Sequence, residues 1–142
     1  MPVSFQRHHF EEVQNGDYYV SEKTDGVRYL MVFTGSNVVL LDRNMQGWKP
    51  KPLNGGGAGG AQNILENLAK HIAPGTVFDG EVVINRKSKR PIFIVFDLLC
   101  NGGAALVKHA FKERLKQLRE GNFVINLGDV KIDQVIDGKV RV

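Results

Sequence analysis

Two apolar runs separated by a short turn, residues 27–42 with the sequence VRYLMVFTGSNVVLLD, decide the fold. In the first run the large apolar residues fall on alternate positions, which places Val27, Tyr29, Met31 and Phe33 on one face of an extended chain. The Gly-Ser-Asn sequence at 35–37 is typical of a turn, and a run rich in valine and leucine follows it. The stretch therefore predicts an antiparallel hairpin.

The segments around this hairpin alternate between strand and helix patterns. Apolar residues at helical spacing predict helices over residues 61–72 and about 105–120. Runs rich in Val, Ile, Phe or Tyr predict further strands at residues 18–21, 76–85, 91–100, 123–125, 130–132 and 135–142. Residues 47–60 contain two prolines and a glycine-rich part and predict a surface loop, with the Gly-rich loop at 49–60. We expect a single α+β domain over residues 1–142, with mainly antiparallel sheets and packed helices.

Composition places the chain among ordinary globular domains. It has 142 residues, is 42% hydrophobic and 24% charged, and carries a formal charge of +4, from 19 basic and 15 acidic residues. Its single cysteine, Cys100, excludes an intrachain disulfide and favours a reducing, intracellular compartment. No apolar run has the length of a membrane span, and residues 1–10 lack the apolar core of a signal peptide. A cytosolic or nuclear protein is expected.

The segment from Ser21 to Met31 gathers three different charged groups. Lys23 ends the expected strand, Asp25 and Gly26 form a turn, and Arg28 starts the next strand, so an amine, a carboxylate and a guanidinium converge. A lysine amine ordinarily titrates near pH 10.4 and must lose its proton to act as a nucleophile, which neighbouring cations favour. Since Asp-Gly is also common in hairpin turns, this spacing alone does not distinguish a reactive loop from a structural one.

Acidic residues in two apolar strands are the second signal. Asp79 and Glu81 occupy alternate positions of the run 77–84, and Asp97 ends the run 92–97. For Asp79, solvation at a strand end and a functional role are equally compatible with the sequence. Glu81 is followed by Val82, Val83 and Ile84, which favours burial with a partner or a metal ion.

In this order the segments resemble the covalent nucleotidyltransferases, the superfamily of mRNA-capping guanylyltransferases and ATP-dependent polynucleotide ligases. The Lys-x-Asp-Gly-x-Arg signature lies at residues 23–28, Asp-Gly-Glu at 79–81 and the aromatic motif at 93–97. Residues 22–31 and 40–44 look more like capping enzymes, whereas 96–99 is also ligase-like. The resemblance covers residues 18–118, the first part of the catalytic module, and implies a nucleotidyltransferase domain of the ligase type (ATP-grasp-like).

The resemblance implies a role for each motif residue. Lys23 would attack the α-phosphate of GTP and carry GMP as a lysyl-GMP phosphoramidate, and Glu81 would contact the ribose or place Mg²⁺ or Mn²⁺. Phe93 would stack on the base, with Phe96 as the alternative. The other implied nucleotide-binding residues are Glu22, Thr24, Asp25, Gly26, Arg28 and Arg43, of which Asp25 orients the loop.

The same resemblance implies partners and a place of action. GMP would pass from the lysine to a 5′-diphosphate RNA, as in mRNA capping, alongside an RNA triphosphatase and RNA polymerase II, in the nucleus or in the cytoplasm if viral. We cannot place the Lys-x-Lys strand that grips the α-phosphate in this family. An ATP-dependent polynucleotide ligase adenylation domain and a catalytically degenerate nucleic-acid-binding module therefore stay open as alternatives.

Two other patterns carry less weight. Residues 55–60 satisfy GxGxxG, but a dinucleotide-binding fold needs a buried strand directly before the first glycine, and the prolines at 50 and 52 argue against one. A flexible linker is the better interpretation. The basic stretch 86–90 is either a solvated turn or a contact for RNA phosphates.

Overall fold

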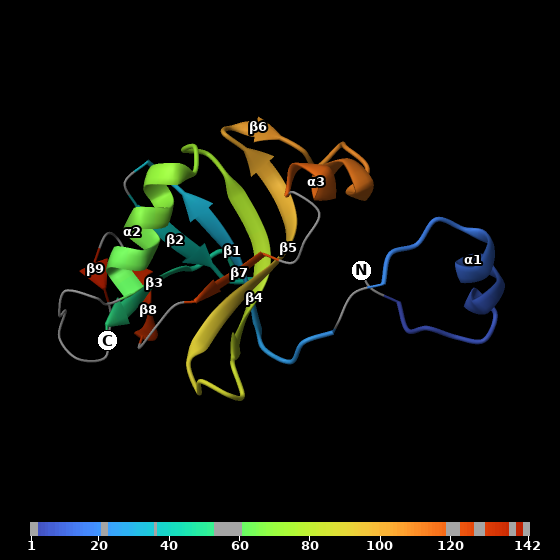
Figure 1. Cartoon of the computed structure of the whole chain (residues 1–142), viewed down its shortest axis with the longest axis horizontal. Helices are drawn as coiled ribbons and strands as arrows, with labels where there is room; N and C mark the ends of the chain where they lie inside the picture. The colour runs from blue at the N-terminus through green and yellow to red at the C-terminus, as the bar shows by residue number, and fades with distance from the viewer. Residues whose placement is uncertain are drawn as a thin grey trace.

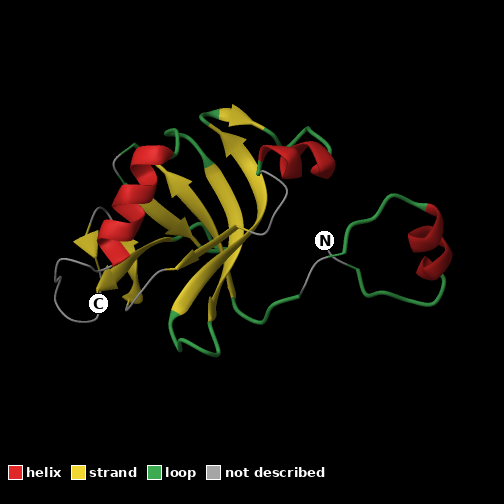
Figure 2. Cartoon of the chain, viewed as in Figure 1, coloured by secondary structure: helices red, strands yellow, loops and turns green. Residues whose placement is uncertain are grey.

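A computed structural model describes residues 3–20, 23–35, 37–52, 61–118, 123–126, 130–136 and 139–140. Three helices and nine strands lie in this part of the chain (Figures 1 and 2). The helices are α1 (His9–Asn15), α2 (Ala61–His71) and α3 (Phe111–Gln117). The strands are β1 (Val27–Phe33), β2 (Val38–Leu41), β3 (Gly47–Pro52), β4 (Val77–Ile84), β5 (Pro91–Asn101), β6 (Ala104–Ala105), β7 (Phe123–Asn126), β8 (Val130–Ile136) and β9 (Lys139–Val140).

All strand pairs among the described residues are antiparallel. The strands form one sheet in the order β6-β5-β4-β1-β2-β3-β8-β9, with β7 pairing with β5. The sheet curls, and α2 packs across its concave side (Figure 1). The fold is therefore α+β with an antiparallel sheet, as the sequence predicts, and β1 and β4 are neighbours near its centre.

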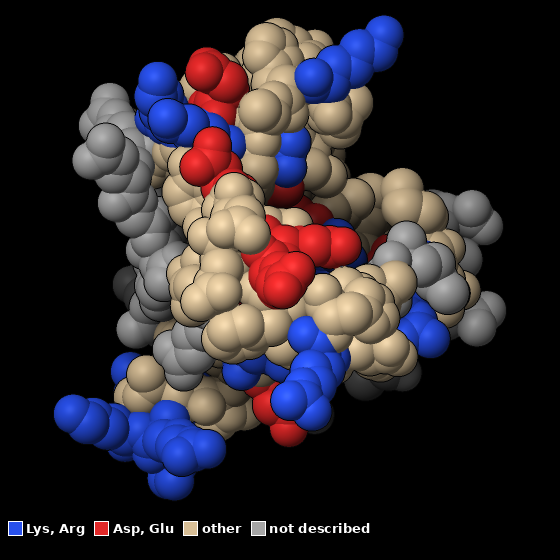
Figure 3. Space-filling model, turned by 90° about the vertical axis from the view of Figure 1, so that its right-hand side faces the viewer, with Lys and Arg blue, Asp and Glu red and all other residues tan. Residues whose placement is uncertain are grey.

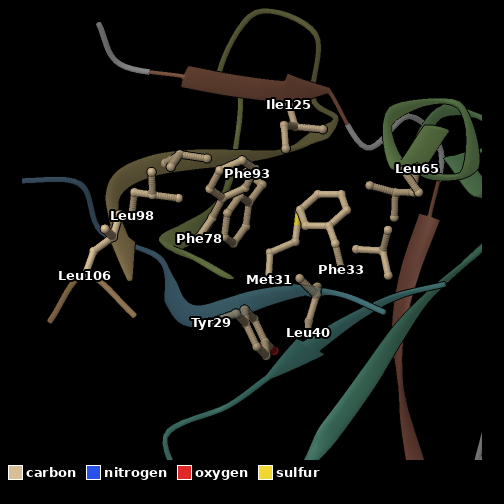
Figure 4. Close-up of a cluster of buried hydrophobic side chains, with 13 residues drawn as sticks. Tyr29, Met31, Phe33, Leu40, Leu65, Phe78, Phe93, Leu98, Leu106 and Ile125 are labelled. Carbon is tan, nitrogen blue, oxygen red and sulfur yellow. The ribbon is translucent and has the colours of Figure 1, made fainter. Parts of the chain in front are cut away.

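The core lies inside the curl of the sheet (Figure 4). Met31 and Phe33 of β1 are fully buried, and Leu65 contributes from α2. Phe33 and Phe78 meet edge to face, with ring centroids 5.4 Å apart. Tyr29 is buried as well, whereas Val27 at the start of the strand is 56% exposed. Three of the four residues predicted to share a face thus form a core wall.

The structure confirms the regular elements that have a clear period. Residues 27–34 and 38–42 form the predicted hairpin, with Leu30 opposite Leu41 and Phe33 opposite Val38. The helix predicted at 61–72 and the strands predicted at 76–85 and 91–100 have the expected type and differ by one residue or so at their ends. The three short strands predicted after residue 122 correspond to β7, β8 and β9, with β8 continuous over the gap expected at 133–134.

Three predictions of local structure are wrong. Residues 47–52 form strand β3 rather than a loop, and residues 53–60 of the expected loop lie outside the described part. Pro50 and Pro52 fit in β3 because residues two apart direct their N–H groups to the same edge, so the other edge keeps its donors for β8. On the other side, β2 pairs only with Gly47 and Trp48.

The other two errors concern residues 18–21 and 105–120. Residues 18–20 are exposed and not in a strand, because no neighbouring strand offers them a partner, and Ser21 is outside the described residues. The helix predicted from 105 begins only at Phe111. Leu106 instead donates its N–H to the Leu99 carbonyl at 2.8 Å and is buried as part of the connection that follows β6.

Helix α1 was not predicted, because its side chains include no buried residue and so show no apolar period. It lies apart from the sheet (Figure 1). No helix in the described part of the chain is long and apolar enough to cross a membrane.

Candidate functional site

The loop 23–26 is bound directly to strand β4. The Thr24 hydroxyl donates a hydrogen bond to the Glu81 carboxylate. Gly26 approaches the same strand so closely that a Cβ there would lie 2.2 Å from the Val82 carbonyl oxygen and 2.4 Å from Val83 Cγ1. Glycine at position 26 is therefore a steric requirement, and the loop that carries Lys23 is held beside the Asp-Gly-Glu motif.

Arg28 and Asp79 form the second link between the motifs. Arg28 Nε lies 2.9 Å from Asp79 Oδ1 and Arg28 Nη2 lies 2.5 Å from Asp79 Oδ2, a bidentate pair. Arg28 is opposite Glu81 in the β1–β4 register, so its side chain reaches diagonally to the acid two residues away on the same face. The hydrogen bond with Asp79, followed by its charge, raises the pKa of Arg28.

The pair joins a buried group to an exposed one. The Asp79 side chain is only 5% exposed, whereas that of Arg28 is 67% exposed. Because the carboxylate has lost most of its water, the guanidinium is the group that compensates its charge. Asp79 thus positions Arg28, and both Asp79 carboxylate oxygens accept hydrogen bonds from that side chain.

A β-bulge in β5 brings Phe96 to this site. Val95 is opposite Gly80 and Asp97 is opposite Asp79, so Phe96 is an extra residue between two consecutive positions of β4. Its ring faces the Arg28 guanidinium, whose carbon lies 5.8 Å from the ring centroid. Phe96 is 36% exposed, which leaves part of the ring accessible beside Arg28.

Phe93, the other candidate for base stacking, lies elsewhere. It is fully buried in the core (Figure 4). Its ring occupies the space that a side chain at position 80 would need, since a Cβ on Gly80 would lie 2.6 Å from ring atoms of Phe93. The structure therefore brings Phe96, and not Phe93, together with Arg28.

A second ion pair, which the sequence analysis missed, lies at Asp97, the residue directly after Phe96. Arg114 of α3 donates to both oxygens of Asp97, at 2.7 and 3.0 Å, and to the His109 carbonyl oxygen at 2.7 Å. The hydrogen bond with Asp97, followed by the charge of Asp97, raises the pKa of Arg114. A carboxylate at the end of an apolar strand was the available signal, because such a group needs a cationic partner.

Arg43 shares a cavity with Arg28. The cavity has a volume of about 260 Å³ and is lined by Arg28, Tyr29, Leu30, Leu41, Asp42, Arg43 and Met45. The turn that carries Arg43 is held by Asp42, which accepts hydrogen bonds from the Asn44 and Gln46 amides and, at 2.8 Å, from the Trp48 indole. These hydrogen bonds, the indole first, lower the pKa of Asp42. Arg28 and Arg43, both predicted to bind nucleotide, thus line the same cavity.

The remaining candidates are placed as follows. Lys23 and Asp25 are exposed on the loop, and Lys23 has no hydrogen-bonding or ionic partner within the described residues. The strand expected to end at Lys23 is absent from residues 17–20 and 23, and Glu22 lies outside the described residues. Residues 23–26 lie in a loop, and the contacts that hold this loop against β4 were not predicted from the sequence.

Glu81 is the carboxylate that fits a divalent cation. Within the part of the chain that the structure describes, no three His, Cys, Asp or Glu residues form a metal cluster. Arg28 and Arg114 occupy both oxygens of Asp79 and Asp97, whereas Thr24 binds only Glu81 Oε2. Magnesium commonly binds through one carboxylate and substrate phosphates, so Glu81 suits it without a cluster.

A lysine-bearing loop bound to an Asp-Gly-Glu strand, with two arginines at one cavity, defines a domain of the nucleotidyltransferase class. Residues 1–135 match the family described as mRNA capping enzyme, catalytic domain. The chain belongs to that family. The capping assignment is confirmed at the family level over the ligase alternative.

Curated relatives agree with the family match. The chain is 38% identical over 125 residues to the mRNA-capping enzyme subunit alpha of Neurospora crassa, an alignment that covers 80% of this chain and 30% of the relative. For the protein of the same name in Saccharomyces cerevisiae the values are 32% over 133 residues, 82% and 28%. The mRNA-capping enzyme of Danio rerio is 25% identical over 144 residues, covering 97% and 22%. The chain spans less than a third of these relatives.

Proposed function

We propose that the chain carries the nucleotide-accepting part of a GTP:RNA guanylyltransferase, which moves GMP from GTP through lysyl-GMP to the 5′-diphosphate end of RNA. The domain would have the ligase-type nucleotidyltransferase fold. One observation carries the proposal: the two motifs, 51 residues apart, are joined by the Arg28–Asp79 pair and the Thr24–Glu81 hydrogen bond. These contacts hold the loop that carries the Lys23 amine beside Glu81 and next to Arg28, which shares a cavity with Arg43.

In the first step the unprotonated Nζ of Lys23 attacks the α-phosphorus of GTP. The P–N bond forms, the bond from the α-phosphorus to the oxygen bridging to the β-phosphate breaks, and pyrophosphate leaves with that electron pair. The amine proton is released to solvent. Lys23 is exposed at the end of a docked loop, so it can reach a nucleotide without displacing a core contact.

In the second step a terminal oxygen of the 5′-diphosphate RNA attacks the same phosphorus. The P–N bond breaks, and the lysine nitrogen takes up a proton as it leaves. Dividing the transfer into two displacements keeps the nucleotide bound while the acceptor changes. Glu81 would hold a magnesium ion, which would neutralise charge on the phosphate oxygens.

The cavity residues hold the nucleotide. Arg28 presents the part of its guanidinium that Asp79 leaves free, and Arg43 reaches the same cavity, so both offer charge-assisted hydrogen bonds to phosphate or ribose oxygens. Phe96 replaces Phe93 as the proposed base-stacking residue, because its ring is accessible beside Arg28. Asp25 and Gly26 shape the loop, and Glu22 remains a proposed nucleotide contact.

The family also bears on partners and location. Fungal relatives are named subunit alpha, which supports a second subunit for this chain too. An RNA triphosphatase fits that role, since a diphosphate end must be produced from a triphosphate. Capping of polymerase II transcripts would place the protein in the nucleus.

Intact-mass measurement tests the proposal. The chain is incubated with Mg²⁺ and either GTP or ATP, and we expect a GMP adduct with GTP only. Lys23→Ala should abolish the adduct, whereas Lys108→Ala, an exposed lysine outside the site, should retain it. An AMP adduct would support a ligase, no adduct with either nucleotide would support a binding module, and an adduct that persists in Lys23→Ala would refute the assignment.

A further inference from the structure

The tip of the β4–β5 hairpin is a strongly basic and fully exposed surface. Residues 86–90 read Arg-Lys-Ser-Lys-Arg, and every one of them is exposed. Basic side chains project from the lower end of the face shown in Figure 3, the end at which this hairpin turns in Figure 1. The tip contains no acidic, aromatic or aliphatic residue, so its only chemical feature is positive charge.

The backbone of this tip is well ordered by hydrogen bonds. Asn85 Oδ1 accepts from the Lys87 and Ser88 amides, both at 3.0 Å. The Asn85 carbonyl accepts from the Lys89 amide at 2.8 Å, and the Asn85 amide donates to the Arg90 carbonyl at 2.9 Å. The charges are therefore presented on a fixed turn, which reduces the entropy lost when a ligand binds.

Lys89 occupies a backbone position that favours glycine. Its φ is +58°, in the left-handed region, where a side chain other than that of glycine, asparagine or aspartate is uncommon. Glycine at this position would relieve the backbone strain. The backbone conformation at position 89 therefore does not favour the lysine that stands there.

The tip lies at the same end of the sheet as the loop of Lys23. The β1–β4 register places Val27 opposite Val82, and Gly26 packs against Val82 and Val83. The loop therefore leaves β1 in the direction of the tip (Figure 1). Arg86 follows Val83 by three positions, which is at most roughly 10 Å of extended chain.

We propose that this tip binds backbone phosphates of the RNA acceptor, next to the 5′ end that receives GMP. The inference rests on the proposed function for the position of that end. Several positively charged side chains on one hydrogen-bonded turn suit the regularly spaced phosphates of single-stranded RNA, independently of base sequence. The tip offers no Trp or Tyr, the aromatic anchors common in protein interfaces, which favours RNA over a protein partner.

Binding of a short single-stranded 5′-diphosphate RNA, measured by fluorescence anisotropy over a range of salt concentrations, tests this surface. The slope of log K against log salt should fall by about 1.4 in the double variant Lys87→Gln/Lys89→Gln, because each phosphate contact on a single strand contributes about 0.7. At 0.1 M salt this corresponds to about 25-fold weaker binding. The matched control is Lys70→Gln/Lys108→Gln, which removes two exposed lysines from other parts of the surface and should bind like the unaltered chain.

Lys89→Gly separates binding from folding. Its unfolding temperature should not fall, because the strained position gains glycine, while its RNA affinity at 0.1 M salt should fall about fivefold. Unchanged affinity and slope in Lys87→Gln/Lys89→Gln would overturn the inference. Binding of an acidic peptide to the tip, together with an RNA affinity that the substitutions leave unchanged, would also overturn the inference.

The adduct assay needs no RNA and distinguishes the two proposals. Lys87→Gln/Lys89→Gln should form lysyl-GMP at the same rate as the unaltered chain. If no adduct forms in any variant but RNA binding still depends on the tip, the proposed transfer fails and the RNA surface stands. If adducts form normally and RNA binding does not depend on the tip, the proposed RNA-binding surface is wrong and the proposed transferase activity is supported.

Discussion

Replacing Arg28 with alanine should destabilise the fold as well as the site. Asp79, whose side chain is 5% exposed in the intact pair, would lose two charge-assisted hydrogen bonds. Breaking a fully buried ion pair costs about 3–5 kcal/mol. Arg28 is 67% exposed, so water can replace part of the interaction, and we expect a loss of about 2 kcal/mol. For a chain of this length that lowers the unfolding temperature by roughly 4–8 °C.

Urea unfolding followed by circular dichroism measures this loss, and a double-mutant cycle assigns it. The cycle combines Arg28→Ala with Asp79→Ala and should give a coupling energy of about 1.5 kcal/mol. Arg28→Lys keeps the charge without the two-pronged geometry and should lose about 1 kcal/mol. Arg86→Ala, at an exposed arginine, is the control and should change stability by less than about 0.5 kcal/mol. A coupling energy near zero would refute the view that Asp79 holds Arg28.

Three further outcomes follow from the same contacts. Gly80→Ala should lower the free energy of unfolding by about 3 kcal/mol, because its Cβ would lie 2.4 Å from the Ile94 carbonyl oxygen; a loss below about 1 kcal/mol in urea unfolding would contradict this packing. Phe93→Ala should cost about 3–4 kcal/mol of stability, because this ring is fully buried. Phe96→Ala should cost under about 1 kcal/mol but weaken GTP binding, measured by titration calorimetry. Weaker GTP binding in Phe93→Ala, with unchanged binding in Phe96→Ala, would restore Phe93 as the stacking residue. Because the pKa of Asp42 is lowered in the folded chain, its contribution to stability is present above the ordinary value of 3.8 and is lost as the pH falls through the folded value. Asp42→Asn should therefore flatten the decline in stability below about pH 4. An identical acid profile of stability for both chains would show that the Trp48 contact does not stabilise the Asp42 charge.

The sequence was most informative where one face of an element is buried. Met31 and Phe33 alternate with less buried residues along β1, and Leu65 and Leu68 lie one turn apart on α2. In both cases the core imposes the period that the sequence carries. The apolar run at 77–84 likewise predicted the strand that carries Asp79 and Glu81.

Features that depend on a distant partner could not be predicted in this way. The bulge at Phe96 exists only in the pairing of β5 with β4, and nothing within β5 marks the extra residue. Similarly, Arg114 is one of several basic residues near α3, and only the fold selects it as the partner of Asp97. The prolines of β3 argued against a strand until the one-sided pairing of that strand was known.

The Asp-Gly-Glu motif connects the core to the chemistry through alternation along one strand. Gly80 faces the core, where the Phe93 ring fills the place of its missing side chain, so the acids on either side of it point to the opposite face. There Asp79 holds Arg28 and Glu81 holds Thr24. The position of the Lys23 loop therefore depends on a glycine that packs against the Phe93 ring and the Ile94 carbonyl oxygen of β5. Gly80→Ala should for this reason reduce adduct formation, because it shifts the backbone between Asp79 and Glu81 without removing any side chain of the site.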